Sequence, residues 1–120
     1  MSSPVVEALG GSGDLQARYA AFRDAAHDAL GEELTAQIRH AVAAVHGIET
    51  PLPKGEAPPA TLAYAKRMPF EHTAISDAEA AAVVAELGED GYVAFSVVAA
   101  LADAECRALK VDLPGFTQPR

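Results

Sequence analysis

Ser76-Asp77-Ala78-Glu79 begins the segment that is most informative about the fold, SDAEAAAVVAELGEDGYVAFSVVAALADAECRALK, which ends at Lys110. Ser76 and Glu79 match a capping box, in which the serine hydroxyl accepts one free backbone N–H and the glutamate accepts another. Gly88 is expected to end the first helix, because glycine adopts the left-handed backbone of a helix C-terminus without strain. Asp90 is expected to cap a second, longer helix that runs to Lys110. The stretch therefore predicts two consecutive helices that meet at Gly88.

The second of these helices carries an apolar stripe at helical spacing, which predicts that one of its faces is buried. Asp103 and Arg107 lie one turn apart on another face, where a weak stabilising ion pair is expected. The stripe consists of Phe95, Val98, Ala102, Cys106 and Leu109.

Three further helices are predicted upstream, where apolar residues recur every three or four positions. The first spans about 14–30 and the second about 32–46, each followed by a glycine that acts as a stop signal. The third spans about 59–68, because proline is tolerated in the first turn and Pro69 is expected to end the helix. The stripe of the first helix consists of Leu15, Tyr19, Phe22, Ala26 and Leu30.

The remaining segments carry turn and linker residues. Residues 1–13 contain Ser, Pro and a Gly-Gly-Ser-Gly run and are expected to be flexible, and 111–120 are expected to form a C-terminal tail. Prolines at four positions between 50 and 59 exclude a regular element there. The prediction is therefore an all-α fold of about five helices, in a single helical domain over 14–110.

The composition fits one domain with a thin core. Half of the 120 residues are hydrophobic, and alanine, which forms helices well but adds little core volume, makes up the largest share of them. Four Phe, three Tyr and no Trp leave few large side chains to fill a core. Oligomerisation is a common remedy for such a chain, and we expect it here.

The charge and the lone cysteine exclude several classes of protein. A net charge of -8 with scattered basic residues argues against nucleic acid and anionic membranes as partners. Cys106 is the single cysteine, which excludes an internal disulfide and a cysteine-based metal site and predicts a small buried side chain. Residues 1–4 lack the features of a signal peptide, and no apolar run reaches membrane-spanning length. We expect a cytoplasmic protein that needs no cofactor or metal.

The order of elements between Ala60 and Leu109 resembles the small all-helical AhpD-like alkylhydroperoxidase / carboxymuconolactone decarboxylase family. The likeness rests on a short helix, an acidic helix, a glycine turn and a long apolar helix that ends near an arginine. The resemblance implies an AhpD-like helical bundle and a homo-oligomer. The segments that carry it are Thr61–Lys66, Ile75–Glu79, Leu87–Asp90 and Ala99–Arg107.

The chain departs from this family at the position of its redox chemistry. Ile38–Gly47 is similar to the helix that leads into the family's Cys-x-x-Cys motif, but Ile48 and Pro51 stand where the two cysteines would fall. The family's relay histidine and glutamate map onto Gly55 and Ala36. Since none of these four residues can form a thiolate, resolve a disulfide or transfer a proton, peroxidase activity that depends on the cysteine pair is not expected.

Four residues are candidates for a site of another kind. His46 ends the second predicted helix beside Gly47, next to the family's active-site position, although a histidine is also favoured at a helix C-terminus for electrostatic reasons. His40 is the other candidate acid or base, but the two histidines are six residues apart and therefore do not form a helical metal pair. Arg39 could bind a carboxylate through its planar fork. Tyr64 could line a pocket or simply fill the core.

Three functions are compatible with these patterns. The first is a non-catalytic AhpD-like protein that acts through oligomerisation, or as a partner subunit of an active relative. The second is a cofactor-free enzyme on the carboxymuconolactone decarboxylase pattern, acting on a small organic acid. The third is an acidic helical adaptor unrelated to the family. A concave site faced by both His46 and Arg39 would favour the enzyme, whereas exposure of the two side chains to bulk solvent would count against it.

Overall fold

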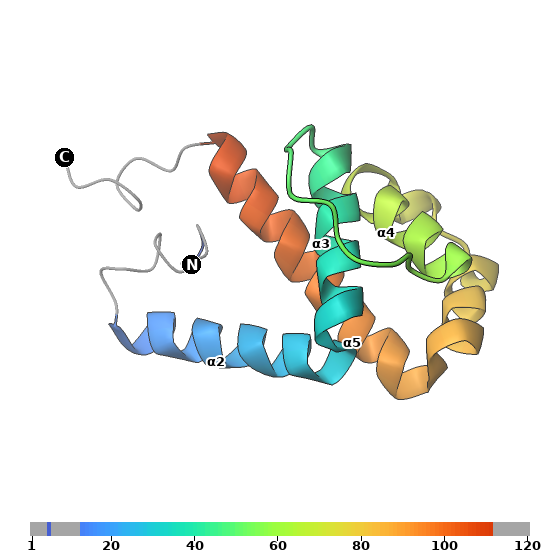
Figure 1. Cartoon of the computed structure of the whole chain (residues 1–120), viewed down its shortest axis with the longest axis horizontal. Coiled ribbons are helices and arrows are strands. Elements are labelled where there is room, and N and C mark those ends of the chain that lie inside the picture. The colour runs from blue at the N-terminus through green and yellow to red at the C-terminus, as the bar shows by residue number, and fades with distance from the viewer. Residues whose placement is uncertain (1–4, 6–12, 112–120) are drawn as a thin grey trace.

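The computed structural model describes Val5 and residues 13–111, and this part of the chain is helical without strands (Figure 1). The predicted all-α class is confirmed. Residues 1–4, 6–12 and 112–120, which include most of the expected flexible segment and tail, lie outside the described residues. The elements are α2 (Gly13–Leu30), α3 (Glu32–Val45), α4 (Pro59–Glu71), the 3-10 turn η1 (His72–Ala74) and α5 (Asp77–Val111).

The predicted count of five helices is not confirmed, because 77–111 form one bent element in place of two separate helices. Gly88, at φ 79° and ψ 169°, is the non-helical residue inside α5. A positive φ strains any residue with a Cβ atom, so the glycine at this position permits a sharp change of direction. The signal in the sequence therefore marks a kink within α5, with no separate loop between its two arms.

The capping box at the start of α5 forms as predicted. Glu79 Oε1 accepts a hydrogen bond from the backbone N–H of Ser76 at 3.1 Å, and Ser76 Oγ accepts one from the N–H of Glu79 at 3.2 Å. Glu79 also pairs with Arg67 of α4. One carboxylate thus starts α5 and ties α4 to it.

Pro69 does not end α4, contrary to the prediction. The helix continues to Glu71, and Pro69 is buried within its last turn. A proline there removes only one of the final intrahelical hydrogen bonds, so the cost is smaller than in a helix centre. The carbonyl of Pro69 also accepts a hydrogen bond from Arg107 of α5, which helps to hold this turn in place.

α5 is the central element, since α2, α3 and α4 all pack against it. Figure 1 shows its C-terminal arm passing behind α3, with α2 and α4 on opposite sides. Alanines such as Ala65 and Ala99 are fully buried, which lets the helices approach closely. The largest fully buried side chains are Phe95, Ile38, Val42, Val83 and Val98. None of the described helices is both long enough and apolar enough to span a bilayer.

The proline-rich segment between α3 and α4 has no regular structure, as predicted, but it is fixed to α3 at several points. Gln37 Nε2 donates to the carbonyl of Lys54 at 2.7 Å, and His40 Nδ1 lies 2.7 Å from Thr50 Oγ1. Gly47, with a φ of 76°, reverses the chain at the end of α3. The segment therefore lies against the surface of α3 and forms a wall over it.

Glu86 of α5 caps the N-terminus of α4. Its carboxylate accepts hydrogen bonds from the backbone N–H groups of Ala60 and Thr61, at 3.0 and 2.7 Å, and from the Thr61 hydroxyl at 2.8 Å. Free N–H groups at a helix start attract negative charge. Partial desolvation opposes ionisation of Glu86, but these hydrogen bonds outweigh it, and the pKa of the carboxyl lies below its ordinary 4.5.

This lowered pKa predicts an acid-sensitive contact between α4 and α5. Glu86 stabilises the fold fully above its ordinary pKa of 4.5, and this contribution is lost as the pH falls through the lowered value of the folded state. Replacing Glu86 by Gln should lower the free energy of unfolding near neutral pH. The variant should also lose less stability than the natural chain between about pH 5 and about pH 3. Urea unfolding across that range measures both effects.

The matched control is Glu89→Gln, at an exposed position of the same helix. A Glu89→Gln profile identical to that of Glu86→Gln would contradict a specific role for the α4 cap.

Candidate functional site

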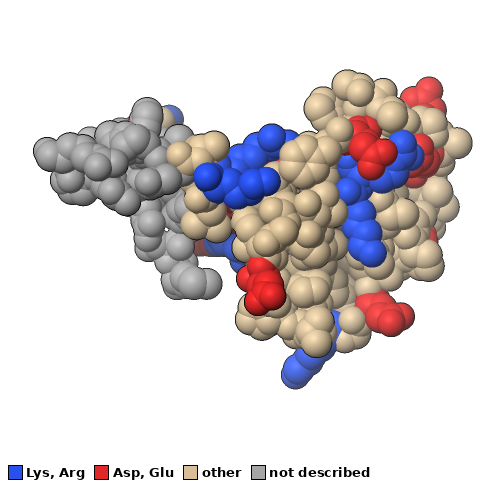
Figure 2. Space-filling view, turned by 90° about the horizontal axis from the view of Figure 1, so that it is seen from above, with Lys and Arg blue, Asp and Glu red and all other residues tan. Residues whose placement is uncertain are grey.

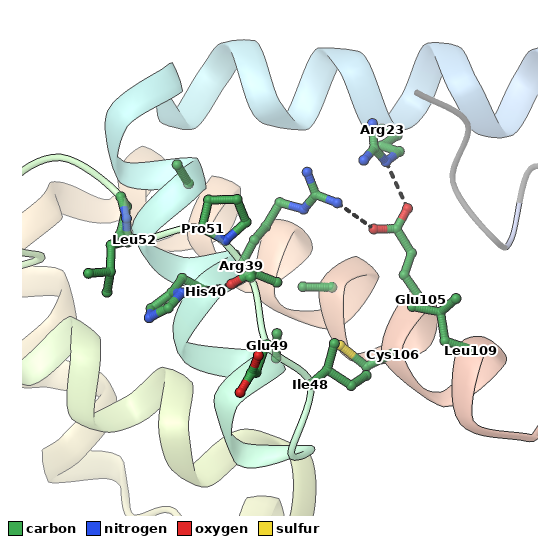
Figure 3. A pocket seen from close by; sticks show the side chains of 15 residues that line it. Arg23, Arg39, His40, Ile48, Glu49, Pro51, Leu52, Glu105, Cys106 and Leu109 are labelled. Atoms are coloured by element: carbon green, nitrogen blue, oxygen red, sulfur yellow. Dashed lines mark hydrogen bonds and ion pairs between the residues drawn. The ribbon is translucent and has the colours of Figure 1, made fainter.

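A cavity of about 740 Å³ lies between α2, α3, α5 and the segment that follows α3 (Figure 3). Most of its wall is apolar, and its polar groups are concentrated in a few charged side chains. A volume of this size is typical of sites for small organic ligands. Apolar side chains on its wall include Ala43, Ile48, Pro51, Leu52, Cys106 and Leu109.

Glu105 of α5 lies between two arginines at one wall of this cavity. Its Oε2 accepts a hydrogen bond from Arg23 Nε of α2 at 2.8 Å, and its Oε1 accepts one from Arg39 Nη2 of α3 at 3.3 Å. The Tyr19 hydroxyl lies 3.4 Å from Oε2. Figure 3 shows both ion pairs as dashed lines that converge on the carboxylate. One side chain therefore joins three helices.

The burial of the three charged groups is uneven. The side chain of Glu105 is 6% exposed and that of Arg23 is 16% exposed, whereas that of Arg39 is 41% exposed. A buried carboxylate needs a compensating partner, and Arg23 supplies the short, sheltered contact. Arg39 adds a longer and more open one. Two guanidinium groups thus share one carboxylate, and Arg39 is the one more open to the cavity, which Glu49 also lines.

The pKa of the neighbouring His27 is lowered. Burial lowers it most, the charges of Arg23 and Arg39 lower it further, and two nearby carboxylates oppose the shift. The neutral imidazole is therefore favoured. A second, smaller hollow of about 360 Å³ between α2 and α3 is lined by His27 and Arg39 together with Asp28 and Glu32.

Arg39 and His40, two of the residues predicted from the sequence, both line the cavity. Figure 3 shows Arg39 extending toward Glu105, while the ring of His40 lies on the side of the Pro51 and Leu52 backbone. His40 is held there by its contact with Thr50. The position of His40 therefore fixes the wall of the cavity, and of these two predicted residues Arg39 is the one that presents a charged group to it.

His46 lies elsewhere, although it was predicted as a catalytic candidate. It occupies the C-cap of α3, with Nε2 2.6 Å from Asp103 Oδ1 and Nδ1 3.3 Å from Lys110 Nζ. An ammonium can only donate, so Nδ1 accepts from Lys110 and Nε2 carries the hydrogen that goes to Asp103. The side chain is completely buried, and its ring packs 4.9 Å from that of Phe70. His46 thus connects the end of α3 to α5 and does not line the cavity.

Tyr64, the fourth predicted residue, belongs to an aromatic cluster away from the cavity. Its hydroxyl lies 3.0 Å from that of Tyr92, and its ring packs edge-on against Phe95 at 5.4 Å. Burial and the hydrogen bond to Tyr92 raise the pKa of Tyr64 to about 12. Of the two roles expected for Tyr64, lining a pocket or filling the core, this arrangement corresponds to the second.

Cys106 lines the cavity as a small buried side chain, in the role predicted for it. Burial raises the pKa of its thiol, and the nearby carboxylates of Asp103 and Glu105 add to this shift. A thiol in these surroundings is neutral and weakly nucleophilic.

The predicted Asp103–Arg107 ion pair also forms, and Arg107 Nε lies 3.0 Å from Asp103 Oδ2.

Glu105 and Arg23 are the residues that the sequence prediction missed. Glu105 lies three residues after Ala102 and four before Leu109, on the side of the helix that carries the apolar stripe. A charged residue beside a buried stripe is a signal for a compensating partner. That signal was present, but nothing in the sequence identified the partners, because Arg23 and Arg39 lie 82 and 66 residues away.

Removing the Glu105 carboxylate should weaken the attachment of α2 to α5 and α3. Glu105→Ala leaves two guanidinium groups without their partner, one of them largely buried, and should lower the free energy of unfolding by about 3 kcal/mol. Hydrogen exchange of the backbone amides should accelerate in α2 more than in α4. Denaturant unfolding and exchange mass spectrometry measure the two effects.

Asp14→Ala is the matched control, because Asp14 forms an exposed ion pair with Arg18 on the same helix. It should cost less than about 1 kcal/mol. Equal losses in the two variants would show that the Glu105 junction does not hold α2.

Comparisons with protein-family models, with curated proteins and with solved structures found no match. The AhpD-like resemblance therefore rests on the order of sequence motifs between Ala60 and Leu109.

Proposed function

We propose that this protein is a non-catalytic, AhpD-like helical protein that acts by associating with further copies of itself through α2. The proposal rests on apolar side chains of the α2 stripe that remain exposed to solvent in the single chain. Leu15 and Phe22 remain 53% and 54% exposed, and Ala26 is the buried residue of this helix. The sequence thus builds an amphipathic helix whose apolar flank is only partly covered within one chain.

The two exposed side chains suit a contact between identical helices. They are seven residues apart and so lie on the same side of α2, about two turns from each other. In an antiparallel pair of α2 helices, Leu15 of each copy would meet Phe22 of the other. An interface in which both copies use the same surface is the usual form of a dimer contact.

Charge also permits this contact despite the net charge of -8. Arg18, close to the flank, is already paired with Asp14 at 3.0 Å, so these two side chains bring no net charge to the interface. Figure 2 shows the molecule from above, the side opposite α2 in Figure 1, and on that face cationic and anionic side chains lie in small groups among a larger uncharged area. Repulsion between copies is then a long-range effect that salt screens.

The enzymatic alternative has weaker support. His46, the proposed acid or base, is buried between Asp103 and Lys110 and does not line the cavity with Arg39. His40 lines it, but its Nδ1 is engaged by Thr50. A binding function for the cavity requires neither histidine to transfer a proton.

The α2 contact predicts a salt-strengthened homo-oligomer. Native mass spectrometry and sedimentation velocity of the natural chain should show dimers or larger even-numbered assemblies, and these should tighten as salt is added. The double variant Leu15→Glu/Phe22→Glu removes the apolar contact and adds like charges. It should weaken association by at least about 100-fold.

Val93→Glu is the matched control, because Val93 is an exposed apolar residue on α5. This variant should associate like the natural chain. A natural chain that remains monomeric at several hundred micromolar, or association unchanged in the α2 double variant, would overturn the proposal.

A further inference from the structure

We infer that the cavity between α2, α3 and α5 binds a small monocarboxylate with an apolar body, whose carboxylate is held by Arg39. This inference does not depend on self-association. Leu15 and Phe22, which would form the contact between copies, do not line the cavity.

The recognition group is the guanidinium of Arg39. Glu105 accepts its closest hydrogen bond from Arg23 at 2.8 Å and a longer one from Arg39 at 3.3 Å. A guanidinium has five N–H donors, and this longer contact uses one of them. The side chain of Arg39 is also the most exposed of the three at 41%. Arg39 therefore keeps donors that can form a forked pair with a second carboxylate.

Charge favours an anion at this wall. Arg23 and Arg39 share the single negative charge of Glu105, so an anion bound to Arg39 would pair with the second guanidinium of this triad. Burial and these two arginines lower the pKa of His27, although nearby carboxylates oppose the shift. Water is partly excluded at this wall, which strengthens an ion pair formed there.

The rest of the cavity suits an apolar body. Ile48 and Pro51 from the segment after α3 face Cys106 and Leu109 of α5 across it. The thiol of Cys106 is kept neutral, because burial and the nearby carboxylates raise its pKa. The volume of about 740 Å³ has room for a ligand of roughly ten to fifteen non-hydrogen atoms.

A carboxylate at the far end of the cavity disfavours a second carboxylate on the ligand. Glu49 also lines the cavity, and Figure 3 shows its carboxylate pointing away from the guanidinium of Arg39, at the other end of the site. A dicarboxylate bound to Arg39 would bring its second charge toward Glu49 with no cation to compensate it. The site therefore selects one carboxylate at the Arg39 end and an uncharged remainder.

Calorimetric titration of the full chain with 3-phenylpropionate tests this inference. The neutral 3-phenylpropionamide has the same shape without the charge and should bind at least about tenfold more weakly. Phenylsuccinate, which carries a second carboxylate, should also bind more weakly. Arg39→Gln should weaken binding of 3-phenylpropionate about tenfold or more, and Arg18→Gln, which alters an exposed arginine of α2, should not change it.

Two further measurements keep the result interpretable. Circular dichroism should show that Arg39→Gln is folded, since Glu105 retains Arg23 as its partner. In the natural chain, the ligand should shift the methyl NMR signals of Ile48 and Leu109, with smaller changes at Val93. The titration is repeated on Leu15→Glu/Phe22→Glu, so that a failure of self-association and a failure of ligand binding are seen separately.

Equal binding of the acid and the amide, or unchanged affinity in folded Arg39→Gln, would overturn the inference. Absence of binding at millimolar ligand would do the same. The inference would also be overturned if the natural chain bound no ligand and Arg39→Gln no longer self-associated. The cavity would then be a contact between protein chains.

Discussion

A carboxylate that leaves water must be compensated inside the protein, and Glu105 meets this requirement by binding an arginine from each of two other helices. α2 contributes little to the buried core, where Ala26 is its buried residue and Leu30 packs partly buried against the cluster. The ion pair of Arg23 with Glu105 adds a sheltered polar link between α2 and α5. The same junction places Arg39 at the wall of the cavity and leaves it with donors to spare.

α5 gives this junction its fixed position. Its central residues, including Phe95 and Val98, are fully buried, and the kink at Gly88 directs its first arm toward α4. Glu79 and Glu86 then tie both ends of α4 to that arm, through Arg67 and through the N–H groups of the first turn. A rigid α4–α5 pair supports α3, and α3 supports the segment that covers the cavity. The charged junction is thus built on an apolar frame of small, closely packed side chains.

The two proposed surfaces use different consequences of the same thin core. A chain rich in alanine buries few large side chains, so apolar residues remain on its surface and spaces remain between its helices. On α2 the uncovered residues are large and form a flank that another helix can cover. Between α2, α3 and α5 the residues are smaller, and the space they leave is enclosed on one side by the arginines. The exposed flank of α2 suits association with another chain, and the space between the helices suits a small ligand.

The local structure follows from patterns that can be recognised in the amino-acid sequence alone. The capping box at Ser76 and Glu79, the glycine at 88 and the periodic apolar residues act within a few positions of the chain, so the helical segments and the break at Gly88 could be predicted from neighbouring residues, whereas the joining of both segments into one bent element was not predicted. The extent of α4 could not, because the effect of Pro69 depends on where the last turn lies and on a hydrogen bond from Arg107.

The site depends on contacts between helices that are distant in the sequence. Arg39, His40 and His46 are close together on one helix, yet the first two line the cavity and the third is buried against Asp103. Helical periodicity gives the angle of each side chain around α3 but not the identity of the neighbour at that angle. The partners of Glu105 are more than sixty residues away in the chain. Its compensation, the spare donors of Arg39 and the exposed flank of α2 all follow from the packing of helices that are distant in sequence, and for this reason they are properties of the folded chain.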